Sequence, residues 1–191
     1  ISPSRQGYPF GQEVAWNYGL NLTHYFLWDY REATLTVDAY RTEFSQQVVA
    51  DLDRNPQGVH FADLAGVSYS NSVQAELNVQ PVERLDLRLA YRYLDVRQAI
   101  NGTLRERPFT ARHRAFVNAA FATERSRDDE AQMLYDLTLQ WYGPKRIPDT
   151  FANPEPFRVP SSSPAFVLLN AQITRSCFTG LDLYLGIENL L

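Results

Sequence analysis

The stretch VSYSNSVQAELNV, residues 67–79, alternates apolar or tyrosine side chains with small or polar ones, and Asn71 is the exception among the apolar positions. A period of two places these two sets on opposite faces of an extended strand, one apolar and one polar. The same pattern recurs along the chain and predicts eight strands: residues 15–26, 33–49, 67–80, 85–96, 110–122, 132–142, 166–174 and 181–190. The predicted fold class is therefore all-β.

Strand length and connection length both favour a membrane barrel over a soluble sandwich. Several predicted strands exceed the usual globular length of about 5–6 residues and reach the roughly 9–11 residues that a tilted strand needs to cross a bilayer. Short connections (residues 27–32, 81–84, 123–131 and 175–180) alternate with long ones (50–66, 97–109 and 143–165). An antiparallel up-and-down transmembrane β-barrel has this arrangement, with periplasmic turns on one side and longer extracellular loops on the other.

Composition leaves two interpretations open. Of the 191 residues, 45% are hydrophobic and 13% aromatic, and the chain has no run of ~18 uncharged apolar residues that would form a transmembrane helix. A barrel strand exposes only alternate residues to lipid, so average hydropathy does not exclude a barrel. A soluble β-sheet with one solvated face gives the same alternation. The net charge of −4 argues against nucleic-acid binding, because there is no basic excess to neutralise phosphates.

Aromatic side chains gather near the predicted strand ends, as in the girdles that membrane barrels place at headgroup level. We expect the interfacial aromatics to be Trp16, Tyr25, Trp28, Tyr91, Tyr93, Trp141 and Tyr142. Packing in a soluble core is the alternative, but a core would also place large rings in the middle of strands.

The order of short and long connections predicts where the two ends of the sheet lie. If the short turns are periplasmic, the first strand runs inward and the eighth runs outward, so both ends lie on the extracellular side. The last residues, Leu190 and Leu191, also lack the aromatic side chain expected of a final barrel strand. The expectation is that residues 1–191 are one internal barrel segment, without a plug domain or a closing strand.

Five segments resemble the β-barrel of TonB-dependent outer-membrane receptors, in the order that this family has them. Residues 183–190, LYLGIENL, are similar to the family's penultimate strand. Residues 16–21, WNYGLN, resemble a strand opening, and residues 38–42, DAYRT, resemble the strand that follows it. Residues 112–116, RHRAF, and 140–143, QWYG, are similar to further family segments. The resemblance spans nearly the whole chain and places it in the C-terminal part of the barrel.

The resemblance implies a barrel of about 22 strands in the bacterial outer membrane, filled by an N-terminal plug domain, with this chain supplying about strands 14 to 21. It also implies import of a bulky scarce nutrient, of the siderophore, cobalamin, glycan or peptide class, energised by the TonB protein through the plug. The wall would do no covalent chemistry, so we expect no enzyme activity and no cofactor. The alternatives are a small passive or structural outer-membrane barrel and a soluble β-sandwich that binds carbohydrate.

Two groups of polar residues are candidates for binding. The first group faces inward and could line the ligand path or contact the plug, since so wide a lumen must be filled by something polar: Asp38, Arg88, Arg92, Asp136 and Gln140. The second group surrounds one extracellular loop and could bind an anionic ligand or lipopolysaccharide phosphates: Arg97, Arg105, Arg107, Arg112 and Arg114. Charge pairing with nearby carboxylates, such as those of Asp95 and Glu106, is the alternative for these arginines.

The sequence predicts neither a catalytic site nor a metal site. It contains no Ser–His–Asp set, no paired catalytic carboxylates and no phosphate-binding loop. Residues 51–55, DLDRN, place oxygen-bearing side chains on alternate positions, as a calcium loop does. However, Pro56 stands where such a loop needs glycine, so a solvated loop is favoured. The three histidines and the single Cys177 have no metal-ligand spacing.

Overall fold

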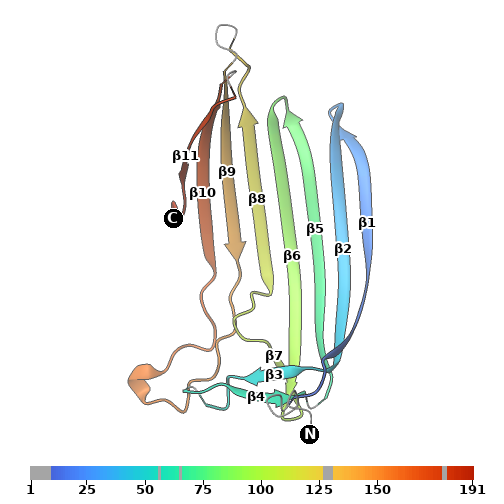
Figure 1. The fold of residues 1–191 in the computed structure, drawn as a ribbon, viewed down its shortest axis with the longest axis vertical. Coiled ribbons are helices and arrows are strands. Elements are labelled where there is room, and N and C mark those ends of the chain that lie inside the picture. Colours follow the sequence, from blue (N-terminus) through green and yellow to red (C-terminus); the bar gives the residue numbers. More distant parts are fainter. Residues whose placement is uncertain (1–9, 56, 65, 127–130, 178–179) are drawn as a thin grey trace.

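The computed structural model describes residues 10–55, 57–64, 66–126, 131–177 and 180–191. Pro56 and parts of the predicted turns 123–131 and 175–180 lie outside the described residues. The main element is one antiparallel sheet whose eight long strands lie side by side in chain order (Figure 1). These strands are β1 (Val14–Trp28), β2 (Arg31–Gln46), β5 (Ser68–Val82), β6 (Leu85–Ile100), β8 (His113–Ala122), β9 (Gln132–Tyr142), β10 (Phe166–Ser176) and β11 (Asp182–Ile187). The predicted all-β up-and-down fold is confirmed.

Three short strands lie in the loops and were not predicted as separate strands; the predicted strand 33–49 divides after Gln46, and its last two residues begin β3. Strands β3 (Val48–Asp51) and β4 (His60–Asp63) form a separate two-stranded ribbon, and β7 (Thr103–Glu106) pairs with the end of β6. The connection 143–165 carries a short 3-10 turn, η2 (Glu155–Phe157). Strands of four residues are too short for a period-two pattern to be recognised. The long connections therefore contain more structure than expected, all at one end of the sheet (Figure 1).

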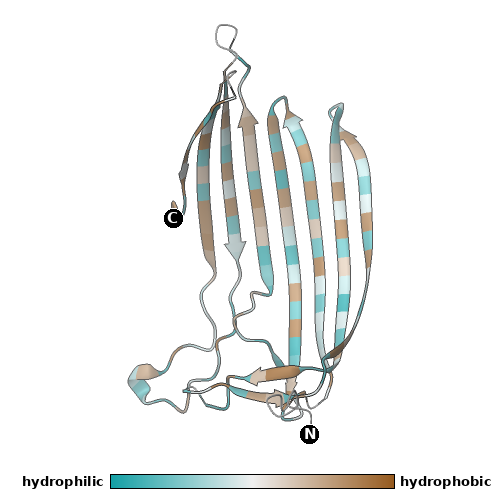
Figure 2. Cartoon of the chain, in the orientation of Figure 1, coloured by the Kyte–Doolittle hydropathy of each residue, from teal (hydrophilic) through white to brown (hydrophobic). Residues whose placement is uncertain are grey.

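The strand register places the predicted apolar rows on one face of the sheet. Leu89 on β6 pairs with Val117 on β8, which in turn pairs with Leu139 on β9. Hydropathy alternates along each long strand accordingly (Figure 2). In the described part of the chain no second sheet covers these rows, and Leu20 and Leu22 are 79% and 67% exposed. A β-sandwich would bury this face against a second layer, so the structure contradicts the sandwich alternative.

Polar residues limit the apolar band at the loop end. On β6 the apolar run of this face extends from Leu85 to Tyr93 and ends at Asp95. Asp95 pairs in register with Asn71 on β5, which pairs with Arg41 on β2. The band therefore has about the height that a strand of roughly 9–11 residues spans across a bilayer. No helix among the described residues is both long and apolar enough to cross a membrane.

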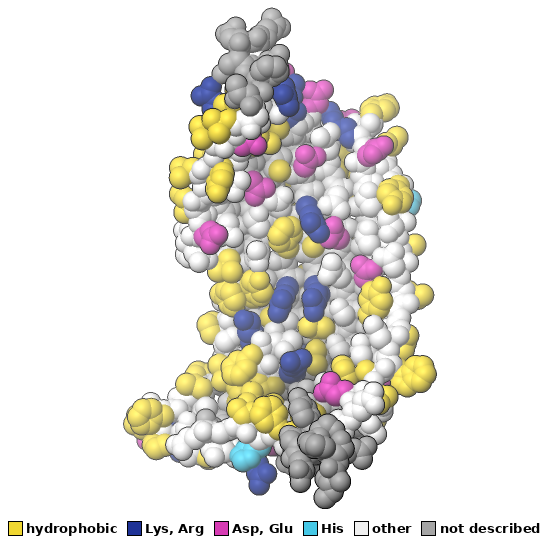
Figure 3. All heavy atoms as spheres, viewed as in Figure 1, with side chains coloured by type: hydrophobic (Ala, Val, Ile, Leu, Met, Phe, Trp, Pro, Cys, Tyr) yellow, Lys and Arg dark blue, Asp and Glu magenta, His cyan; other side chains and the backbone are white. Residues whose placement is uncertain are grey.

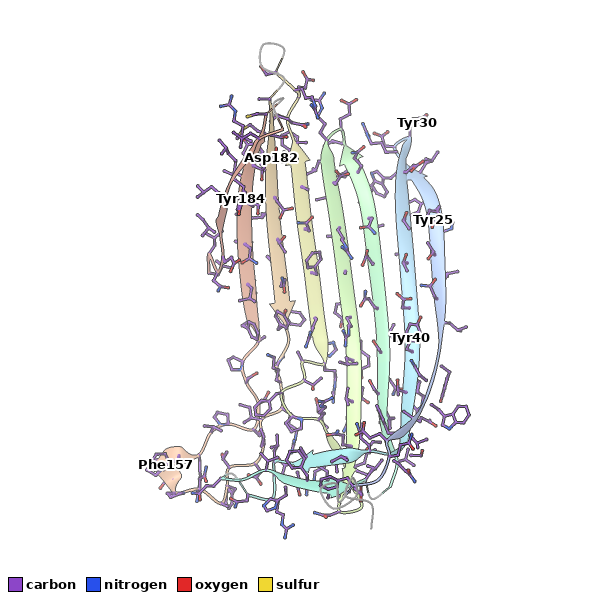
Figure 4. All side chains as sticks on the ribbon, in the orientation of Figure 1. Tyr25, Tyr30, Tyr40, Phe157, Asp182 and Tyr184 are labelled. Carbon is purple, nitrogen blue, oxygen red and sulfur yellow. The ribbon has the colours of Figure 1, made fainter. Side chains whose placement is uncertain are left out.

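Tyr40 lies against Gly19 where β1 pairs with β2, on the face opposite the apolar band (Figure 4). A Cβ atom added to Gly19 would collide with the ring of Tyr40 and with the carbonyl oxygen of Ala39. An aromatic ring covering the backbone of a strand glycine is a device that fixes strand register. Glycine is required at position 19 because the Tyr40 ring and the Ala39 carbonyl oxygen leave no room for a side chain.

We expect Gly19→Ala to destabilise the sheet by about 1–3 kcal/mol, the usual cost of overpacking, because the tyrosine ring must move. Gly186→Ala on β11 is the matched control, because its nearest atoms lie at 3.8 and 3.9 Å and leave room for a methyl group. The measurement is the urea midpoint of the protein refolded in bilayers, followed by tryptophan fluorescence. Equal midpoints for the two variants would show that the Tyr40 contact does not constrain the sheet.

Candidate functional site

Charges on the polar face divide along the length of the strands. Basic side chains gather over β6 and β8, as the space-filling view of this face shows (Figure 3). Toward the loop end lie Arg92, Arg107, Arg114 and Lys145, whereas Asp86, Asp136 and Asp182 lie toward the short turns. The half of this face nearest the loops is therefore electropositive, and the other half is more acidic.

Arg92 and Arg114 stand directly opposite each other in the β6–β8 register. Both side chains are half-buried, and the Nε atom of each is buried without a hydrogen-bond partner. The guanidinium of Arg114 lies over the ring of Tyr142, 5.1 Å from its centroid. Among the described residues, no carboxylate forms an ion pair with either arginine. Like charges at directly opposed positions destabilise a strand pair.

The other four inward-facing candidates have partners within the wall. Arg88 forms an ion pair with Glu76 at 2.9 Å. The remaining three accept hydrogen bonds: Asp38 from Asn21 (2.5 Å), Asp136 from Asn118 (2.8 Å) and Gln140 from the Tyr142 hydroxyl (2.8 Å). A cavity of about 300 Å³ brings Arg88, Arg92 and Gln140 together with Arg114, whereas Asp38 and Asp136 lie outside its lining.

The structure does not bring the five loop-associated arginines into one group. Three form ion pairs: Arg97 with Asp95 (3.0 Å), Arg112 with Glu106 (2.8 Å) and Arg105 with Asp53 (3.3 Å). For these three arginines, the structure shows pairing with nearby carboxylates, which was the alternative to an anion-binding role. Arg107 lines a second cavity together with Arg92 and Arg97, and Arg114 lines the cavity of about 300 Å³ on the polar face. Sequence proximity alone had suggested a shared site.

The predicted girdle aromatics divide between the two faces. The register places most of them on the apolar face: Trp16, Trp28, Tyr91, Tyr93 and Trp141. Tyr25 and Tyr142 lie on the polar face instead, where Tyr142 stacks on Phe166 with ring centroids 4.9 Å apart. His113 lies beside these aromatics on the apolar face without having been predicted there, since its Nδ1 lies 2.6 Å from the Tyr91 hydroxyl. Its face could have been read from the alternation of residues 113–122.

Asp53 links the three long loops at the end of the sheet. Its carboxylate accepts hydrogen bonds from Arg105 in the β6–β7 hairpin (3.3 Å), and from Arg146 (2.5 Å) and the Asp149 amide (3.0 Å) in the loop 143–165. The Asp53 side chain is only 4% exposed. We call this arrangement the Asp53 clasp. Burial alone would raise the pKa of the Asp53 carboxyl, but the hydrogen bonds from Arg146, Asp149 and Arg105 hold the pKa below its ordinary value of 3.8.

In the sequence DLDRN, which resembles part of a calcium loop, both aspartate side chains accept hydrogen bonds from other groups of the protein. Asp51 accepts the backbone N–H groups of Asp53 (3.0 Å) and Arg54 (3.2 Å), which turns the chain after β3. Asp53 is engaged by the arginines of the clasp. Within the described residues, no group of three or more His, Cys, Asp and Glu side chains could hold a metal ion.

Two adjoining cavities, of about 430 and 520 Å³, lie in the loop layer and share residues 147–150. Phe109 and Val59 line the first, and Phe151 lines the second. These rings are open to solvent, since Phe109 is 59% and Phe151 is 74% exposed. The loop end of the sheet thus presents apolar recesses to its surroundings, on loops that the Asp53 clasp holds together.

Comparison with known proteins agrees with this arrangement. A family model described as "TonB dependent receptor-like, beta-barrel" matches residues 2–190. No curated protein and no solved structure matches the chain. The family match covers nearly the whole sequence, and it accounts for a sheet with one lipid-type face, one polar face and long loops at one end. The chain belongs to the TonB-dependent receptor β-barrel family, whose members are non-enzymatic transporters of the bacterial outer membrane.

Proposed function

We propose that residues 1–191 form one wall segment of a receptor that imports a bulky scarce nutrient of the siderophore, cobalamin, glycan or peptide class. The observation that carries the proposal is the ordered loop layer, with its apolar recesses, at the entrance to a polar face. The apolar face would contact outer-membrane lipid, and its outward arginines at the loop end would lie near lipopolysaccharide. Family membership implies a plug domain and an interaction with TonB.

Capture of the nutrient would begin in the loop layer. Clefts lined by apolar and aromatic side chains with a few polar groups are the usual form of small-molecule sites. Phe109, Val59 and Phe151 supply the apolar surface, and Asn55 and Asp149 supply polar groups in the same recess as Phe109. A recess of this kind suits a ligand with both apolar and hydrogen-bonding parts.

Movement inward would follow the polar face. The side chains of this face carry both signs of charge, with basic groups nearer the loops and carboxylates nearer the short turns. In this proposal Asp38, Arg88, Arg92, Asp136 and Gln140 face the plug or the passing nutrient. The plug and the closing strand would come from other parts of the parent protein.

The test is uptake by cells that carry the full-length receptor. Deleting its gene should abolish growth on one limiting nutrient from a panel of the four classes, and complementation should restore it only in cells with TonB. Uptake that continues without TonB would contradict the proposal and favour the passive-barrel alternative.

Removing the two recess rings should weaken capture of that nutrient. Phe109→Ala with Phe151→Ala is expected to raise Kd about tenfold, since truncating an anchor ring typically costs more than about 1 kcal/mol. Phe157→Ala is the matched control, because this ring is 69% exposed on η2 and does not line either recess (Figure 4). An equal loss of affinity in the control would argue against the recesses as the capture site.

A further inference from the structure

We propose that Arg92 and Arg114 together hold a carboxylate of the plug domain inside the lumen. The inference rests on the proposed function, because it requires a plug within the same barrel. It singles out one pair among the polar residues of the wall and names the chemistry of its partner.

No carboxylate among the described residues of the wall forms an ion pair with Arg92 or Arg114. Their positions are opposed in the register of β6 and β8, and both Nε atoms are buried without a hydrogen-bond partner. The carboxylates within the neighbouring part of the wall are already used, since Glu76 pairs with Arg88 and Asp136 accepts a hydrogen bond from Asn118. Two adjacent positive charges therefore lack a carboxylate partner among the described residues of this face.

An anion that compensates this pair would stabilise the wall whether or not a nutrient is bound. Opposed like charges destabilise the β6–β8 pairing at all times, including when no nutrient is bound. A nutrient visits the lumen only during transport, whereas the plug fills it in the resting receptor. A plug side chain therefore compensates the pair more completely than a nutrient does.

The surroundings of the pair suit a carboxylate. Guanidinium groups bind carboxylates through paired, charge-assisted hydrogen bonds, and two of them together can satisfy both oxygens. Phe116 and Tyr142 line the same cavity and exclude part of the water, which strengthens such bonds. The cavity, of about 300 Å³, has room for an acidic side chain.

The experiment uses the purified full-length receptor without nutrient. Hydrogen exchange of the plug is compared between the parent and the double variant Arg92→Gln, Arg114→Gln. Exchange in one acidic plug segment should become about ten- to a hundredfold faster, the change expected when charge-assisted hydrogen bonds are lost. Arg97→Gln is the control, because Arg97 lies on the same strand but pairs with Asp95 on the opposite face. A photo-crosslinking residue at position 92 should capture that same plug segment.

Two results would overturn the inference. The first is unchanged plug exchange in the double variant, even if position 92 crosslinks to the plug. The second is the absence of a plug crosslink while citrate, added as a carboxylate probe, protects both arginines from phenylglyoxal, which would assign the pair to an imported solute. Failure of the proposed function would appear in a different experiment, as nutrient uptake that continues in cells without TonB.

Discussion

Replacing Leu35 with arginine should destabilise the membrane-inserted barrel by about 2–4 kcal/mol, the cost of a lipid-facing arginine near the bilayer midplane. Leu35 is 38% exposed on the apolar face of β2 and pairs in register with Leu77 on β5. It lies midway between Arg31 at the short turn and Arg41 at the loop end of the same face. Its neighbours in register are Leu77 on β5 and His24 on β1, so a guanidinium at this depth has no carboxylate of the described wall beside it.

Thr36→Arg is the matched control, one residue further along the same strand. Thr36 lies on the polar face and pairs in register with Glu76, so the new guanidinium would meet a carboxylate and water. We expect the free energy of unfolding to change by less than about 1 kcal/mol, as for solvent-exposed ion pairs. The measurement is the urea midpoint of the full-length receptor refolded in bilayers. Equal losses in both variants would mean that the two faces have been assigned wrongly.

The faces of the sheet could be predicted because strand geometry has a strict period of two. Leu85, Leu87 and Leu89 share a face whatever the neighbouring strands do, and the family resemblance fixes which face meets lipid. The same rule would have placed Tyr142 on the polar face, since it is in phase with Asp136 and Gln140. Nearness to a strand end, the criterion used for the girdle, carries no information about the face.

Contacts between loops could not be predicted from the sequence. Asp53 and Arg146 lie 93 positions apart. They meet because the loop between β2 and β5 and the loop between β9 and β10 lie at the same end of the sheet. Likewise, Arg92 and Arg114 become opposed through the register across a long connection. Grouping arginines by sequence proximity therefore mixed three ion-paired residues with two that form no ion pair among the described residues.

Asp53→Asn should open the loop layer, because it removes the charge that holds two arginines at one nearly buried carboxylate. Breaking a buried ion pair by removing one partner costs about 3–5 kcal/mol, and the lower end is expected here because Arg105 remains 45% exposed. Hydrogen exchange of residues 143–165 in the full-length receptor measures this opening. The urea midpoint of the barrel should stay unchanged, since the clasp lies outside the membrane band.

Asp149→Asn is the control for the same loop. Among the described residues, its exposed carboxylate accepts a hydrogen bond only from the nearby Phe151 amide (2.8 Å), while its backbone N–H still donates to Asp53. Acid should reproduce the Asp53→Asn effect in the unmodified receptor. The pKa of Asp53 is lower in the folded loop than its ordinary value of 3.8, so the clasp is fully formed above that pH and weakens as pH falls through the lowered pKa. Loops that open equally in both variants, or that keep their protection in acid, would show that packing of the apolar recesses, rather than this carboxylate, holds the layer together.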